Sequence, residues 1–514
     1  MHPGAVSIPY WATSYLHEFD VDGRKWLALV EALHYNDAMM TIANDLNADL
    51  CYEALRSHDA RFDGKFFTAV KTTGIYCRPV CTARLPLKEN CTFYKRPEQA
   101  EMAGFRPCMR CRPELSPGRT PTESGNRAVS VIERGFRTDM TVCEMAHKAG
   151  LSERQLRRVV LKACGVNPVE LLQSRRLLAA KLLLTDTRLS ITEIAFASGF
   201  GSPRRLNALF QERYGINPTE MRRLRAASED GFVVCKLAYR PPMDWTALLA
   251  FLSYRCIDGV EAVTEKSYRR LVTFGGASGV ITAEDNHEQS CVVLQIPDAL
   301  AKYTLEICAR IRDLFDLDAD PQIISGRLGT IAASSPGRRV PGCWDGFEVA
   351  VRAVCGQQIS VKAATILTGK LAARFGVQQA PTVDDLRYHF PTPDAMAAAD
   401  LESIITCGTI RTRAVTIQEL AKQISDATLR LSPTADPERT IARLKTISGV
   451  GDWTAQYVCM RALRWPDAFP AADLVIMKRL KVTRQRDAEA LAEEWRPWRA
   501  YAAMHLWQRK ETDQ

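Results

Sequence analysis

The sequence lacks the features that would place it in a membrane or outside the cell. No apolar run reaches the length of about 18 residues that a membrane-spanning helix needs, and no basic and then apolar leader stands at its start. Twelve of the 16 cysteines are scattered singly through stretches typical of helices or strands, which is not the pattern of a disulfide framework. We therefore expect free, mostly buried thiols, a cytoplasmic location and no membrane partner.

Length and charge point to several domains and an anionic partner. A chain of 514 residues is too long for one ordinary core, so three or four domains are expected. The formal net charge is +9, and the segment from Arg119 to Arg225 alone holds 19 Lys or Arg against 10 Asp or Glu, a surplus of 9. Basic charge concentrated in one segment is typical of a protein that binds nucleic acid.

Composition and periodicity divide the chain into six parts. Residues 1–48 carry no motif that we can assign, although Trp26–Leu33 and Ala38–Leu46 each fit a short amphipathic helix. A small α+β region follows over 49–115, then a linker over 116–125 (SPGRTPTESG) and a helical region over 126–229. Strand and helix patterns mix over 230–318, and 319–514 is almost wholly helical, with long amphipathic runs such as Phe347–Phe375 and Thr440–Leu463.

Two close cysteine pairs predict a zinc site. Cys77-x3-Cys81 and Cys108-x2-Cys111 are separated by 26 residues, and four thiolates around one centre suit tetrahedral Zn²⁺, whereas calcium and magnesium prefer oxygen. Zinc would leave such a site with net charge −2 and keep the sulfurs deprotonated and nucleophilic. The alternative is that zinc only holds together a core too small to fold alone.

The sequence around these cysteines resembles the amino-terminal domain of the Ada family of alkylation-response proteins. The likeness runs from about Ala54 to Pro113 and includes "AVKTTGIYCRPVCTAR", "RLPLKENCTFY" and "AGFRPCMRCRPE". It implies that Cys77 irreversibly accepts a methyl group from a methyl phosphotriester in DNA, and that the resulting loss of negative charge strengthens DNA binding. It further implies phosphate contacts from Thr73, Arg84 and Arg106. Thr82 stands where family members can carry another basic residue.

The helical region contains one unit twice. "VCEMAHKAGLSERQLRRVVLKACGVNPVE" and "ITEIAFASGFGSPRRLNALFQERYGINPTE" agree in their Ala, Gly, Leu and Asn-Pro positions. This repeat resembles the AraC-type domain, with two helix-turn-helix units on a joining helix, Pro168–Leu184, and turns at Gly150 and Gly199. The recognition helices would be Glu153–Cys164 and Ser202–Tyr214. The expected DNA-contacting residues on them are Arg154, Arg157, Arg158, Arg204, Arg205 and Asn207. The alternative is a helical bundle with a solvated basic face.

The stretch "LKTISGVGDWTAQYVCMRALRWPDAFPAADLVIMKRL" carries the most information in the second half. Gly449 and Gly451 bound a hairpin before a helix that starts near Asp452, so backbone N–H groups there can face a phosphate. Asp473 follows Gly451 by 22 residues in an apolar setting. The combination resembles the helix-hairpin-helix glycosylases of the AlkA family, and the resemblance assigns the catalytic carboxylate to Asp473. The same sequence would also suit Asp473 as the N-cap of a helix, and the two roles are compatible.

Aromatic side chains are expected to hold the cationic alkylated base once it is flipped from the duplex. The candidates are Trp453, Trp495, Trp498, Tyr501 and Trp507, of which Trp453 and Trp498 are favoured. The resemblance covers roughly Asp230 to Trp507 and includes "FEVAVRAVCGQQISVKAA", where the family has a loop that fills the gap left by the flipped base. Gln358 occupies the place where some relatives have leucine.

Together these features predict a multidomain protein, mainly α with α+β. It would consist of a small zinc-bound α+β domain, an all-α double helix-turn-helix domain, a small α/β domain and an all-α helix-hairpin-helix glycosylase domain. We expect methyl transfer to Cys77, excision of alkylated purines, and double-stranded DNA and RNA polymerase as partners. A transcriptional regulator with an inactive glycosylase-like half is the alternative. The Pro-Cys-His-Arg signature of a methylguanine methyltransferase is absent, so direct reversal of guanine alkylation is not expected.

Overall fold

The computed structural model describes residues 46–118, 124–138, 140–223, 231–380 and 385–508. The two helices expected near the amino terminus lie outside these ranges, apart from Leu46. Among the described helices, none combines the length and the hydropathy needed to cross a membrane. All 16 cysteines are described, none forms a disulfide, and most are buried, as predicted.

A small four-stranded sheet forms the first region, in the order β3-β1-β2-β4. The central strand β1 pairs antiparallel with β2 and β3, and β2 pairs parallel with β4. Its apolar core is split into small clusters, as expected for a region that needs a metal to hold it. The elements are α3 (Ala48–Arg56), β1 (Phe67–Val70), β2 (Ile75–Cys77), β3 (Cys91–Tyr94), α4 (Pro97–Met102) and β4 (Arg106–Pro107).

Seven helices follow in the described residues between 124 and 223, and they confirm the predicted repeat. The first recognition helix has the predicted bounds, the second begins at Pro203 with Ser202 as its N-cap, and the joining helix extends to Asp186. Gly199 has φ +84°, and a Cβ there would lie 2.3 Å from a backbone oxygen, so the second turn requires glycine. The helices are α5 (Ser124–Gly135), α6 (Val142–Ala149), α7 (Glu153–Cys164), α8 (Pro168–Asp186), α9 (Ile191–Ala197), α10 (Pro203–Tyr214) and α11 (Pro218–Arg223).

A five-stranded sheet in the order β5-β9-β8-β7-β6 occupies the middle of the molecule. Every pairing in it is antiparallel, so the helices flank the sheet and do not cross over between parallel strands. The mixture of strand and helix patterns predicted over 230–318 is confirmed. The elements are β5 (Phe232–Ala238), α12 (Trp245–Ser253), β6 (Glu261–Val263), β7 (Ser267–Phe274), β8 (Ala277–Asn286), β9 (Cys291–Pro297) and α13 (Thr304–Leu314).

The last region is helical, and each of its two long amphipathic runs is interrupted. The first breaks at Gly356, after which Ser360 caps a new helix, and the second breaks at the hairpin that contains Gly449. The helices are α14 (Pro321–Leu328), α15 (Gly346–Cys355), α16 (Val361–Phe375), α17 (Pro393–Ala398), α18 (Leu401–Thr406), α19 (Arg411–Ser425), α20 (Pro437–Leu444), α21 (Asp452–Ala462), α22 (Leu474–Arg479), α23 (Gln485–Ala492) and α24 (Arg499–Gln508).

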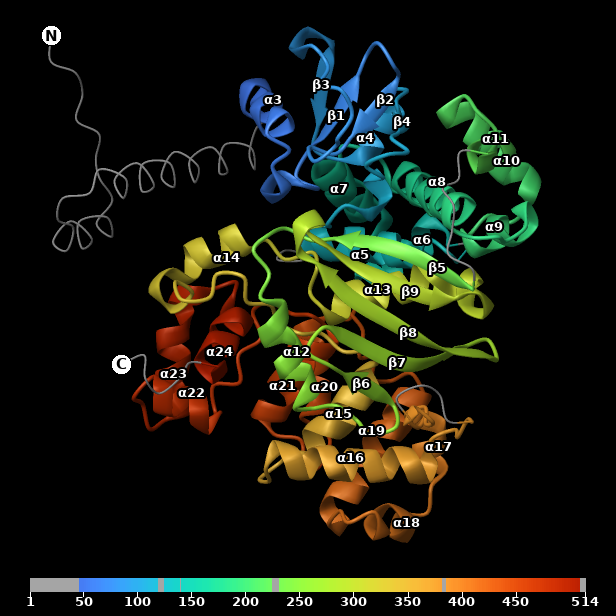
Figure 1. Ribbon diagram of the computed structural model, residues 1–514. Coiled ribbons are helices and arrows are strands. Elements are labelled where there is room, and N and C mark those ends of the chain that lie inside the picture. Colours follow the sequence, from blue (N-terminus) through green and yellow to red (C-terminus); the bar gives the residue numbers. More distant parts are fainter. Residues whose placement is uncertain (1–45, 119–123, 139, 224–230, 381–384, 509–514) are drawn as a thin grey trace, which may run out of the picture.

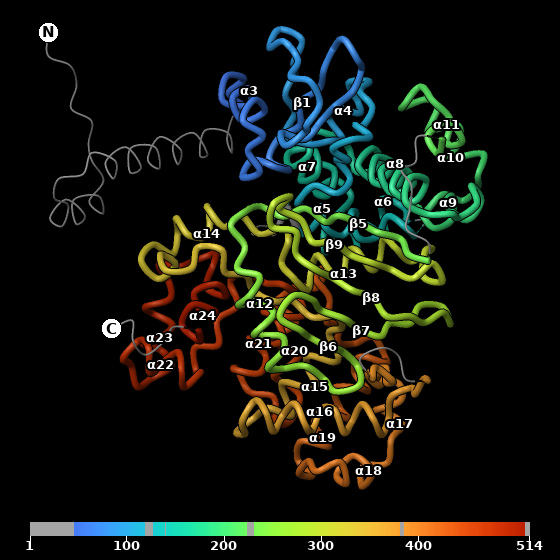
Figure 2. The backbone as a smooth tube through the Cα atoms, in the orientation of Figure 1, coloured from blue at the N-terminus to red at the C-terminus, as the bar shows by residue number. Residues whose placement is uncertain are grey.

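The second repeat unit, the large sheet and the last helices share a core. One continuous apolar cluster includes Leu206 of α10, Val292 of β9 and Met504 of α24, and α15, α19 and α21 surround a second one. Figures 1 and 2 show the small sheet and the repeat helices stacked on one side of the large sheet, with α15 to α21 on the other. The ion pairs Arg134–Asp313 (2.6 Å) and Arg137–Glu306 (2.9 Å) join α5 and the turn that follows it to α13.

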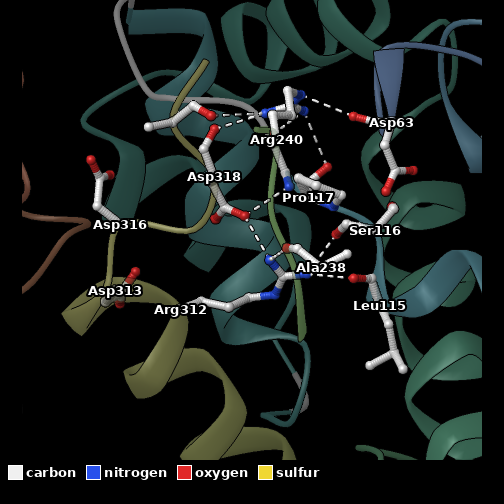
Figure 3. A network of polar contacts seen from close by, with 12 residues as sticks. Asp63, Leu115, Ser116, Pro117, Ala238, Arg240, Arg312, Asp313, Asp316 and Asp318 are labelled. Carbon is white, nitrogen blue, oxygen red and sulfur yellow. Dashed lines mark hydrogen bonds and ion pairs between the residues drawn. The ribbon is translucent and has the colours of Figure 1, made fainter. Parts of the chain in front are cut away.

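Part of the predicted linker is held firmly in place. Arg240, at the end of β5, donates to the carbonyl oxygens of Asp63 (2.9 Å), Asp318 (2.9 Å), Pro117 (3.3 Å) and Gly118 (2.6 Å). Arg312 of α13 donates to the carbonyls of Leu115 (2.8 Å) and Ser116 (2.6 Å), as Figure 3 shows. Ser116–Gly118 is therefore packed between the first region and the large sheet.

Candidate functional site

The four predicted ligand cysteines lie together. The sulfur atoms of Cys77, Cys81, Cys108 and Cys111 are all within 4.8 Å of one another. The amide of Arg78 donates to the Cys111 sulfur at 3.2 Å, which suits a thiolate acceptor. Four soft, closely grouped sulfur donors on short loops fit one zinc ion, which is the cofactor of this region.

Cys77 is the most accessible ligand. It is half-buried, whereas the other three cysteines are buried. It lines a groove of about 490 Å³ together with Thr73 and Arg84, which are both exposed, and with the exposed apolar Leu85 and Leu87. Cys81 and Cys108 also line this groove, so Cys77 is the most exposed of the ligand cysteines there.

Arg106 does not line this groove. It is half-buried on β4, and its Nη1 atom is buried without a hydrogen-bond partner. Arg110, which was not among the predicted contacts, lies beside Thr82, because its Nη1 donates to the Thr82 carbonyl at 3.0 Å. The Arg110 guanidinium thus supplies a positive charge beside Thr82, whose own side chain is uncharged.

The two predicted recognition helices present their polar side chains to solvent. The side chains in question, all exposed, are Arg154, Arg157, Arg158, Arg204, Arg205 and Asn207. Arg157 makes an ion pair of 3.6 Å with Glu153. Leu156 of α7 and Leu206 of α10 are fully buried, whereas Leu161 of α7 is exposed. Both helices therefore offer a basic surface that a DNA groove can accept.

Asp473 caps a helix and borders a cavity. Its Oδ1 accepts the amides of Val475 (2.9 Å) and Ile476 (3.1 Å), and its Oδ2 accepts the indole N–H of Trp453 (2.8 Å). The two predicted roles of this residue, N-cap and cavity carboxylate, are thus compatible in geometry. The carboxylate is held in one orientation by donors on both oxygens.

The cavity beside Asp473 has aromatic walls and a volume of about 420 Å³. The rings of Trp453 and Tyr457 stack 5.2 Å apart at 6°, and Trp507 lies 6.2 Å from Tyr457. Burial acts to raise the pKa of Tyr457, but the positive charges of Arg461 and Arg255 outweigh burial and lower it. Tyr457 was not among the predicted aromatic residues, although its position four residues after Trp453 places it on the same helix face.

The prediction for Trp498 is wrong. Trp498 is 6% exposed, packs against Tyr501 at 5.7 Å and belongs to the shared core, not to the cavity lining. Trp495 and Tyr501 are buried in the same core. The error arose because sequence alone does not distinguish the tryptophans of the last helices. Of the expected aromatic side chains, only Trp453 and Trp507 line the cavity within the described residues.

The hairpin and the Gln358 loop are tied together. Gly449 has φ +86°, and a Cβ there would lie 2.4 Å from the Thr416 hydroxyl, whereas a Cβ on Gly451 would meet nothing within 4 Å. Gly451 therefore leaves the start of α21 open. Gln357 donates to the carbonyl of Gly449 at 2.8 Å, and Gln358 has φ +56°, a strained conformation for a side chain of its size.

Comparisons with known proteins agree with this arrangement. The family profiles described as "Metal binding domain of Ada", "Helix-turn-helix domain", "AlkA N-terminal domain" and "HhH-GPD superfamily base excision DNA repair protein" match residues 50–114, 145–224, 234–345 and 351–500. The third match runs past the predicted boundary at 318, and Ile324 and Val340 of that extension belong to the shared core.

A Mycobacterium tuberculosis protein named "Probable bifunctional transcriptional activator/DNA repair enzyme AlkA" is 35% identical to this chain over 479 residues, which are 89% of the chain and 95% of the relative. The chain therefore belongs to the family of bifunctional transcriptional activators and DNA repair enzymes. The "DNA-3-methyladenine glycosylase 2" of Escherichia coli is 36% identical over 53% of the chain and 95% of its own length. The "Bifunctional transcriptional activator/DNA repair enzyme AdaA" of Bacillus subtilis is 33% identical over 37% of the chain and 90% of its own length.

As a member of the bifunctional activator/repair family, the chain combines an Ada-type zinc region, a helix-turn-helix region and an AlkA-type glycosylase. Its partner is DNA. The Cys77 groove and the Asp473 cavity are separate sites, because different regions form them and different residues line them.

Proposed function

We propose that this protein senses methylated DNA through Cys77 and excises alkylated purines, of the 3-methyladenine type, through Asp473. The sensing half of the proposal rests on the accessibility of Cys77 among four clustered cysteines. The repair half rests on the oriented carboxylate of Asp473 beside an aromatic cavity. We divide the chain at the boundaries predicted from the sequence, from the zinc domain at 49–115 to the glycosylase domain at 319–514.

In the first reaction, the thiolate sulfur of Cys77 attacks the methyl carbon of a methyl phosphotriester. The new S–C bond forms as the C–O bond breaks, and the electron pair stays on the oxygen of the restored phosphodiester. Zinc, when bound by the four cysteines, keeps their sulfurs deprotonated at neutral pH. Thr73 and Arg84 line the same groove and are proposed to hold the phosphate. Arg106, which lies outside the groove, is proposed as a further contact. The product is stable, so each molecule reacts once.

In the second reaction, Asp473 stabilises the positive charge that develops on deoxyribose as the bond to the alkylated base breaks. The base leaves as a neutral molecule because alkylation has already made it cationic, and water adds to the sugar. Trp453, Tyr457 and Trp507 supply electron-rich faces for the flipped base. Gly449 and Gly451 are proposed to receive a phosphate at the start of α21, and Gln358 to fill the gap in the duplex.

The helix-turn-helix region would turn the methyl mark into a transcriptional response. Arg154, Arg157, Arg158, Arg204, Arg205 and Asn207 are the proposed DNA contacts. An activator acts by recruiting RNA polymerase, which we propose as a protein partner. The unpaired thiols suit the reducing cytoplasm, where we place the protein.

The sensing proposal is tested by incubating the zinc-loaded protein with a duplex that carries one methyl phosphotriester as a mixture of both phosphorus diastereomers. Intact-mass and peptide analysis should find one methyl group on Cys77. The matched control is Cys143→Ser, which changes an exposed cysteine outside the cluster and should leave uptake intact. Absence of methyl on Cys77 would leave zinc as a purely structural ion.

The repair proposal is tested with a duplex that contains one N7-methylguanine. Wild-type protein should release the base, and Asp473→Asn should lose most of the activity while keeping its fold, because the amide oxygen can still cap α22. Absence of release by the wild type, across methylated purines, would favour the alternative that this half serves only to bind DNA.

A further inference from the structure

A buried carboxylate joins the zinc region to the second recognition helix. The hydroxyl groups of Tyr76 and Tyr214 both donate to Oε1 of Glu101, at 2.9 and 3.1 Å. The three residues come from β2, α4 and α10, and their exposed fractions are 0%, 2% and 4%. One oxygen atom therefore receives a hydrogen bond from each of the two regions.

One end of this bridge lies beside the cysteine cluster, and the other lies on the second recognition helix. Tyr76 precedes Cys77 on β2, and its carbonyl accepts the amide of Cys108, another cysteine of the cluster, at 3.0 Å. Tyr214 is the last residue of α10, whose first turns carry Arg204 and Arg205. A displacement of β2 at the cysteine cluster would move the Tyr76 hydroxyl and, through Glu101, the carboxyl end of α10.

A carboxylate in this place is costly unless both donors are present. Burial raises the pKa of Glu101 to about 7, because water no longer solvates the charge. A buried polar network whose hydrogen bonds are made can fix one specific arrangement of the elements that it joins. The bridge therefore favours one relative position of the two regions.

The rest of the interface depends on other residues. Glu98, also on α4, makes ion pairs with Arg96 (3.1 Å) and with Arg175 of α8 (3.3 Å). Arg96 also pairs with Glu133 of α5 at 2.7 Å. These contacts attach α4 to α5 and α8, so the loss of the Tyr214 hydroxyl should leave the two regions docked.

We propose that the Tyr76–Glu101–Tyr214 bridge transmits the methylation state of Cys77 to the second recognition helix. This inference rests on the proposed methyl transfer. Methylation adds a methyl group and removes one negative charge at the end of β2, next to Tyr76, and the shift reaches α10 through two hydrogen bonds. The second helix-turn-helix unit thereby receives the signal directly, in addition to the general fall in repulsion from DNA.

The test uses the zinc-loaded full chain before and after reaction with the methyl phosphotriester duplex. Intact mass measures methyl uptake, and hydrogen–deuterium exchange measures the protection of amides in Pro203–Tyr214. Wild type should show a several-fold change in exchange across this helix on methylation. Tyr214→Phe should take up the methyl group equally well but lose the change. Tyr501→Phe is the matched control, since it removes a buried hydroxyl bonded to Asp316 in the other half.

A second variant guards against misfolding. Glu101→Gln keeps a side-chain oxygen that can accept both hydroxyl groups, so it should retain the change in exchange. Methyl uptake by wild type with no change in the exchange of α10, or a full change in Tyr214→Phe, would overturn the bridge and leave the methyl transfer standing. Absence of methyl uptake would overturn the methyl transfer and the bridge mechanism with it.

Discussion

The indole N–H of Trp453 donates to the Asp473 carboxylate at 2.8 Å, while the same indole ring stacks on Tyr457. Trp453 therefore serves the site in two ways: it orients the carboxylate, and it forms a wall of the cavity that would hold the base. The two contributions are separable, because phenylalanine retains a flat ring but has no N–H group.

Trp453→Phe should slow base excision by about 10- to 100-fold, since a hydrogen bond to a charged acceptor contributes roughly 1.5–3 kcal/mol. The measurement is the single-turnover rate of N7-methylguanine release. Trp495→Phe, which changes a buried tryptophan that packs on Phe469 outside the cavity, is the control. An unchanged rate in Trp453→Phe would show that the two backbone amides suffice to orient Asp473.

Substitution of Trp507 should lower the rate of base excision, whereas substitution of Trp498 should lower the stability of the fold. Trp507→Ala removes a cavity wall, so excision should fall by about 5- to 150-fold, as the stacking contribution is about 1–3 kcal/mol per base. Trp498→Phe shrinks a core side chain and should lower the stability by roughly 1–3 kcal/mol. Its excision rate per folded molecule should stay near that of wild type. Thermal unfolding and single-turnover excision on both variants check the assignment, and a reversed pattern would contradict it.

The sequence predicted local features well where the spacing of a few residue types determines the structure. The cysteine pairs, the Gly-punctuated helix-turn-helix repeat and the N-cap position of Asp473 are all of this kind, because each depends on a few neighbouring residues. It failed where long-range packing decides. Trp498 precedes α24 and Trp507 lies within it, and only long-range packing places Trp498 in the core and Trp507 at the cavity. Likewise, no pattern in the sequence of Ser116–Gly118 predicts the hydrogen bonds that Arg240 and Arg312 donate to this segment.

Arg240→Met should loosen the segment that joins the zinc region to the helix-turn-helix region. The substitution leaves the carbonyls of Asp63, Pro117, Gly118 and Asp318 without their Arg240 donor, at an expected cost of about 2–4 kcal/mol. Limited proteolysis should then cut near residues 116–125 much faster than in wild type. Arg327→Met, which removes an exposed arginine bonded to a single carbonyl, is the control. Equal cleavage of both variants would show that Arg312 alone holds the segment.

Removal of zinc should unfold the first region preferentially. Its apolar clusters are small, so most of its stability should depend on the metal. A chelator should increase hydrogen exchange in β1 and β2 by orders of magnitude and leave α15 and α21 protected. Cys81→Ser should mimic the chelator, whereas Cys143→Ser should not. Retained protection of β1 and β2 after zinc removal would mean that docking onto α8 and β5 is enough to fold them.

The stability of the protein should depend on the protonation of Glu101. Its pKa is raised by burial from 4.5 to about 7, so a proton on Glu101 binds the folded chain more tightly than the unfolded chain. This contribution to stability is fully present below pH 4.5 and is lost as the pH rises through 7.

Glu101→Gln stays neutral at every pH and still offers an oxygen to both tyrosines, so it should not show this loss. Between roughly pH 6 and pH 8 the wild type should lose about 1 kcal/mol relative to Glu101→Gln. The measurement is urea denaturation of the zinc-loaded proteins, and histidine titration cancels because both chains carry the same histidines. Glu53→Gln, an exposed change in the same region, should follow the wild type. Parallel pH profiles for wild type and Glu101→Gln would mean that water reaches Glu101 and that the bridge is not sealed.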